Sequence, residues 1–98
     1  MWRHGDVLIA SIETIPWNAK LRPDVVLAQG ESTGHSHRIE YPPSAELWEL
    51  NGQVYLKVVA DSARVVHEEH NPITLPQGLY RVWKQREYTP EKIRPIYD

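Results

Sequence analysis

The chain has 98 residues, a formal net charge of −2 and no cysteine, so disulfides and thiolate metal sites are excluded. The balanced charge argues against a nucleic-acid or membrane partner. No apolar stretch is long enough for a signal peptide or a membrane span. We therefore expect one soluble, cytoplasmic domain over residues 1–98.

Short strands separated by turn residues are expected in the first half of the chain. The β-branched run over residues 6–15 predicts one strand, and the apolar run over 25–29 predicts another after a loop over 17–24. Residues 35–41 predict a third strand, which ends at two prolines. Eight prolines in a chain of this length work against long helices.

The clearest local signal is a β-hairpin over residues 46–59. Apolar and polar side chains alternate on both sides of Asn51-Gly52, which suits a type I′ turn because both central residues need positive φ. A two-residue loop would place Leu47 opposite Leu56 on the neighbouring strand.

The second half of the chain predicts strands over residues 63–67, 73–75 and 79–88, followed by a short helical turn over 90–94. The last strand interleaves basic and aromatic side chains, as sheets that bind single-stranded nucleic acid do. Neighbouring acidic residues and the overall charge favour a structural edge strand instead. About seven short strands together predict an all-β fold, a small antiparallel β-sandwich or barrel.

The aromatic residues are four Trp and five Tyr, with no Phe. Both carry a polar atom that needs a partner when buried, so they are typical of pocket walls and protein interfaces. Together with an exposed sheet edge, they lead us to expect a homo-oligomer, most simply a homodimer. A pocket for a small-molecule substrate would use the same residues.

Histidines are the candidate site residues. The period of two puts His35 and His37 on one strand face with Tyr41, and we expect this face to point inward. His67 ends the apolar face of a later strand and is also expected inside, whereas His4 is isolated near the N-terminus and is not expected in the site. Imidazoles that share one interior predict a divalent transition metal: Zn, Fe, Ni, Mn or Cu. Histidines that bond only carbonyls or carboxylates are the alternative.

Further candidates lie on the turns near these histidines. His70 cannot share a strand face with His67 at a spacing of three, but the bend between them allows it to turn back towards the metal. Glu31, Glu68 and Glu69 would each serve as a ligand, as the partner of a ring N–H, or as a general base. Solvated turn carboxylates are the alternative.

The segment His35-Ser36-His37 with Glu40, and the later Pro76-Gln77-Gly78, resemble the two motifs of the cupins. Cupins are small β-barrels that hold a metal ion, so the resemblance implies that architecture and a metal-dependent enzyme acting on a small molecule. This chain differs in that no histidine follows Pro76-Gln77-Gly78.

The chain also resembles a small uncharacterised family from bacteria or phages. The shared features are Thr-Gly-His-x-His-Arg over residues 33–38, His-Glu-Glu-His over 67–70 and Gln-Arg-Glu-Tyr over 85–88. This resemblance implies no function.

Two functions follow from these observations. The first is a histidine-cluster metal-binding domain, extended by the cupin resemblance to an enzyme whose ion polarises a carbonyl or activates water or dioxygen. The second is a non-enzymatic binding or assembly module with structural histidines and an aromatic interface. A substrate-sized pocket that opens onto the histidines would favour the enzyme, and a sealed cluster would favour the module.

Overall fold

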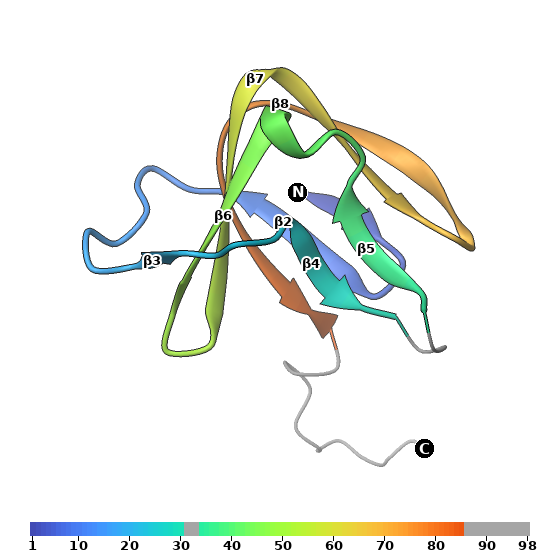
Figure 1. Cartoon of the computed structure of the whole chain (residues 1–98), viewed down its shortest axis with the longest axis horizontal. Coiled ribbons are helices and arrows are strands. Elements are labelled where there is room, and N and C mark those ends of the chain that lie inside the picture. The colour runs from blue at the N-terminus through green and yellow to red at the C-terminus, as the bar shows by residue number, and fades with distance from the viewer. Residues whose placement is uncertain (31–33, 86–98) are drawn as a thin grey trace.

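Antiparallel strands make up most of the computed structural model, which describes residues 1–30 and 34–85 (Figure 1). The elements in chain order are β1 (Trp2–His4), β2 (Val7–Ser11), β3 (Lys20–Leu21), β4 (Val26–Gln29), β5 (Ser36–Ile39), the 3-10 turn η1 (Pro42–Ser44), β6 (Ala45–Leu50), β7 (Gln53–His67) and β8 (His70–Lys84). The strands form one curled sheet, a half-barrel, so the all-β prediction is confirmed. The helical turn expected over 90–94 lies outside the described residues.

A long hairpin, β7–β8, is the centre of the sheet. Each of its two strands has 15 residues. The strands β2 and β1 continue the sheet beyond β8, while the other edge of β7 pairs with β6 along its first part and with β5 near its end. Because one strand serves two neighbours, the sheet divides beyond β7 into two arms, β6–β3 and β5–β4 (Figure 1).

Two strand predictions need correction. The segment 63–67 is not a separate strand but the end of β7, and the segment after Gly78 belongs to β8, which lies between β2 and β7 and is not an edge. Pro76 did not end the strand because it pairs with Ser62 beside a shift in the β7–β8 register, where a ladder N–H is not required.

The hairpin between β6 and β7 is confirmed in detail. Asn51 has φ 51° and Gly52 has φ 80°, the left-handed values that a type I′ turn requires. Leu47 pairs directly with Leu56, and both are fully buried.

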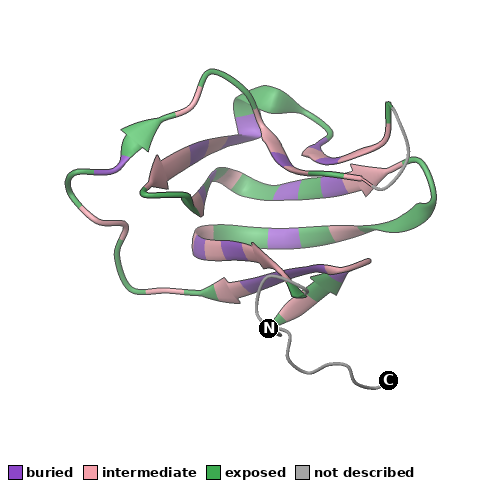
Figure 2. Ribbon diagram, turned by 90° about the horizontal axis from the view of Figure 1, so that it is seen from below, coloured by how far each residue is buried: buried purple, intermediate pink, exposed green. Residues whose placement is uncertain are grey.

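The core consists of the apolar side chains that alternate with exposed ones along the strands (Figure 2). Its most deeply buried members are Val7, Ile9, Leu47, Leu56, Val58, Val65, Leu75 and Tyr80. The Tyr80 hydroxyl donates a hydrogen bond to the carbonyl of Pro76, which satisfies its polar atom inside this core.

One inward prediction was wrong, because Tyr41 is 67% exposed. Strand β5 ends at Ile39 and Tyr41 is already the N-cap of η1, so the strand alternation no longer governs its direction. Trp17 is also exposed, but association of copies through such aromatics stays a prediction. Within the described residues, no helix has the length and apolar character needed to cross a membrane.

Candidate metal centre

All five histidines of the chain lie together at one end of the β7–β8 hairpin. His4 ends β1, His35 and His37 come from β5 and the residue before it, and His67 and His70 flank the hairpin turn. Neighbouring imidazole rings have centroids 4.4–6.4 Å apart. Strands β1 and β5 and the tip of the β7–β8 hairpin all lie in the right-hand half of Figure 1.

The hairpin turn places His67 and His70 opposite each other. They form a register pair across β7 and β8, with ring centroids 4.6 Å apart. The bend expected between them is this hairpin turn, and it brings His70 back beside His67. In a two-residue hairpin loop the flanking residues pair directly, and their side chains point to the same face.

His4 is the site residue that sequence reasoning missed. The short strand β1 returns through Gly5 and Asp6 into β2, so that His4 pairs with Val7 and is 2% exposed. A strand of three residues shows no alternation that would mark an inward face. The sequence signal for this turn was the glycine at position 5. In the structure Gly5 has φ +64°, a left-handed value that suits a tight turn.

His37 is the most constrained member of the cluster. Its side chain is 2% exposed, its Nδ1 lies 2.9 Å from Nδ1 of His4, and its Nε2 lies 3.7 Å from Oδ1 of Asp6. Burial, followed by the nearby histidines, lowers the pKa of His37 to about 4 despite the opposing effect of Asp6. The ring is therefore neutral at pH 7, as a metal ligand must be.

Two sets of side chains bring possible ligand atoms within 4.8 Å of one another: His37, His67 and His70, and His35, His67 and Glu68. The three histidines of the first set have centroid separations of 4.4, 4.6 and 5.6 Å. Metal–nitrogen bonds of about 2.0–2.1 Å at tetrahedral angles put ligand rings about 5 Å apart. The ring separations of the first set are therefore close to those that a shared ion requires.

The predicted set of His35, His37 and His67 is thus divided by the structure. His67 lies near both of the others, with ring centroids 5.6 Å from His35 and 4.4 Å from His37. His35 and His37, however, fall into different sets of converging ligand atoms.

The turn glutamates already have partners. Glu68 accepts hydrogen bonds from the Ser36 amide at 3.1 Å and from Arg38 at 3.1 Å. Its own backbone N–H, and then these two donors, lower the pKa of the Glu68 carboxyl. The Glu69 amide donates to His67 Nδ1 at 2.9 Å, and its carboxylate lies 3.6 Å from His35. Glu31 lies outside the described residues.

Two glycines, which have no side chain, make room for the imidazole rings. A Cβ added to Gly5 would lie 2.7 Å from Nε2 of His70, and one added to Gly30 would lie 2.8 Å from Nε2 of His67. Both distances are too short for real contacts, so a side chain at either position would displace a histidine.

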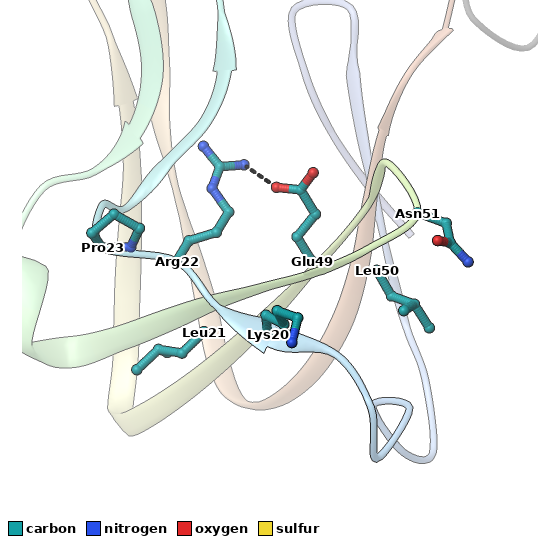
Figure 3. Close-up of a pocket in the computed structure, with 7 residues that line it drawn as sticks. All are labelled: Lys20, Leu21, Arg22, Pro23, Glu49, Leu50 and Asn51. Atoms are coloured by element: carbon teal, nitrogen blue, oxygen red, sulfur yellow. Dashed lines mark ion pairs between the residues drawn. The ribbon is translucent and has the colours of Figure 1, made fainter.

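Three pockets described by the structure lie away from this cluster. In the one shown in Figure 3, Arg22 and Glu49 point towards each other with 3.8 Å between their charged atoms, and Arg22 also pairs with Asp24. Two further pockets, beside the loop before β3 and between β4 and β8, are also lined by residues other than histidine.

The fold and the cluster define a small all-β half-barrel whose candidate site is a histidine cluster at the end of its central hairpin. The chain belongs to the family described as Domain of unknown function (DUF8820), whose model matches residues 3–85, a span that includes all five histidines. This confirms the resemblance to an uncharacterised family, whereas the cupin resemblance is not confirmed. No curated protein and no solved structure matches the chain.

Acid is expected to destabilise the metal-free protein through His37. Its pKa is about 4 in the folded protein and ordinarily about 6.5, so between these values the unfolded chain binds a proton that the folded protein does not. The free energy of unfolding should therefore fall as pH drops from about 6.5 to about 4, by on the order of 3 kcal/mol for this residue. Urea unfolding at several pH values measures this effect. His37→Leu should flatten the dependence, and an equally steep fall in that variant would contradict it.

Proposed function

We propose that this protein binds one divalent transition-metal ion through His37, His67 and His70. The observation that carries this proposal is the convergence of three imidazoles whose ligand atoms lie within 4.8 Å of one another. They are held by β5 and by the two ends of a paired hairpin, so strands rather than a loop set their positions. Imidazole ligands suit Zn, Cu, Ni and Fe better than Ca or Mg.

The charges favour this set over the one formed by His35, His67 and Glu68. Arg38 lies 3.1 Å from the Glu68 carboxylate, so a cation bound there would face a guanidinium. In the proposed set, Oδ1 of Asp6 lies 3.7 Å from Nε2 of His37 and adds a negative charge beside the ion.

The exposure of the ligands suggests an open coordination position. His37 is buried and His67 is half-buried, but His70 is exposed, so solvent reaches one side of the set. Three protein ligands plus an exchangeable water is the arrangement of catalytic zinc sites. We propose that the ion acts there on water or on a carbonyl of a small molecule.

A structural ion is the second candidate. Strand β5 pairs with β7 at only two register positions, Arg38↔Val66 and Ile39↔Val65. An ion that joins His37 of β5 to the β7–β8 hairpin would fasten this arm of the sheet. In that case removing the metal lowers the free energy of unfolding strongly, whereas an exchangeable catalytic ion leaves most of it in place.

Metal binding is expected to break one identified hydrogen bond. Nδ1 of His67 accepts from the Glu69 amide, so the neutral ring carries its proton on Nε2. A metal on Nδ1 displaces that amide, and a metal on Nε2 moves the ring proton to Nδ1, which then no longer accepts. The Glu69 amide must therefore lose its partner in either case.

The test is metal content and titration of protein purified without an affinity tag. We expect about one bound zinc per chain by elemental analysis and calorimetry. A change of the Glu69 amide signal in ¹H–¹⁵N spectra should accompany binding. Glu13→Gln, beyond the far end of β2, is the control and should bind normally. Absence of binding across Zn, Cu, Ni, Fe and Mn would contradict the proposal.

A further inference from the structure

His4 is buried in the cluster but belongs to neither set of converging ligand atoms. Its two ring nitrogens are both engaged: Nε2 lies 2.9 Å from the carbonyl oxygen of Asn71, and Nδ1 lies 2.9 Å from Nδ1 of His37. The residue therefore forms a bridge from the backbone of β8 to the most deeply buried of the proposed ligands.

The backbone carbonyl fixes the proton on His4. A carbonyl oxygen only accepts hydrogen bonds, so Nε2 of His4 must carry the hydrogen that it donates to Asn71. The His4 side chain is 2% exposed, and such burial disfavours the charged imidazolium, so the neutral ring carries no second proton. Nδ1 of His4 is consequently an acceptor.

The proton on His37 follows from this. Because Nδ1 of His4 accepts, Nδ1 of His37 must be the donor in the 2.9 Å contact between them. A neutral His37 then has its lone pair on Nε2, the nitrogen that lies 3.7 Å from the Asp6 carboxylate. The His37 lone pair therefore points to the side of the ring where the Asp6 carboxylate adds a negative charge, which favours a cation there.

We propose that His4 is a positioning residue that holds His37 with Nδ1 protonated and Nε2 presented to the metal ion, an inference that rests on the proposed function. The chain from Asn71 through His4 to His37 acts as the outer shell of the site. Such partners fix the tautomer and the ring orientation of a metal-binding histidine, and their loss typically lowers metal affinity about 10–100-fold. His4 itself does not contact the ion.

The first test needs neither metal nor mutation. Long-range ¹H–¹⁵N spectra of the metal-free protein report which nitrogen of each imidazole carries the proton. We expect His37 to be protonated on Nδ1 and His4 on Nε2. A His37 protonated on Nε2, in a native protein that binds metal, overturns the role of His4 alone. A native protein that binds no metal overturns the proposed function and this role with it.

The second test uses two variants of matched shape. In His4→Asn, the amide oxygen stands close to the position of Nδ1 and still accepts from His37, whereas His4→Leu has the same size without an acceptor. We expect His4→Leu to lose about 10–100-fold in zinc affinity and to shift the His37 tautomer, while His4→Asn stays within about 3-fold of the native protein. If both variants lose the same zinc affinity and keep the native His37 tautomer, His4 acts only through packing, and the inference is overturned.

Discussion

Replacing His37 with glutamine is expected to lower zinc affinity by at least about 100-fold, the upper end of what loss of an outer-shell partner costs. His37 supplies the one buried, neutral imidazole of the proposed set, with its pKa lowered to about 4. Its removal leaves His67 and His70 at the two ends of the hairpin turn, and two histidines do not form a three-ligand site. Isothermal titration with zinc, together with circular dichroism to verify folding, measures the loss.

The variants His70→Gln and His35→Gln locate the ion. In the proposed site His70→Gln should resemble His37→Gln, whereas His35→Gln should retain affinity within a few-fold, because His35 belongs to the other set of ligand atoms. If His35→Gln loses as much affinity as His37→Gln while His70→Gln binds normally, the ion lies beside Glu68 instead.

The local features of the fold were predictable from the sequence because each depends on residues close together in the chain. Asn51-Gly52 specified a turn with positive φ at both positions, and the alternation around it specified the pairing of Leu47 with Leu56. The arrangement of the sheet was not predictable in this way. A 15-residue strand that serves β6 and β5 in succession looks like two strands when only the apolar pattern is followed.

The positions of the histidines were only partly predictable from the sequence. Alternation correctly turned His37 inward, with 2% exposure, because β5 is regular at that point. The sequence left the direction of His70 open because its position depends on where the hairpin turns, and His4 was not expected in the site because its position depends on which strand β1 pairs with. Both are non-local facts, which a single sequence expresses weakly.

A large loss of stability is expected from Leu56→Ala. Leu56 is fully buried and lies between two other buried side chains, Leu47 across β6 and Tyr80 across β8. Truncation leaves a cavity, and the strand pairing of β6 and β8 with β7 prevents Leu47 and Tyr80 from moving in to fill it. The free energy of unfolding should therefore fall by about 2–5 kcal/mol. Of a total near 5–15 kcal/mol for a domain of this kind, that is a large share. Urea unfolding at pH 7 measures it.

The matched control is Leu21→Ala, which removes the same atoms from a side chain that is 56% exposed on β3. Its effect should stay within about 0.5 kcal/mol, since no buried contact is lost. At 25 °C, folded Leu56→Ala protein should still bind zinc with native affinity, because Leu56 lies on the hairpin far from the turn that holds His67 and His70. Equal destabilisation by the two substitutions would show that the layer of Leu47, Leu56 and Tyr80 is not the centre of the core.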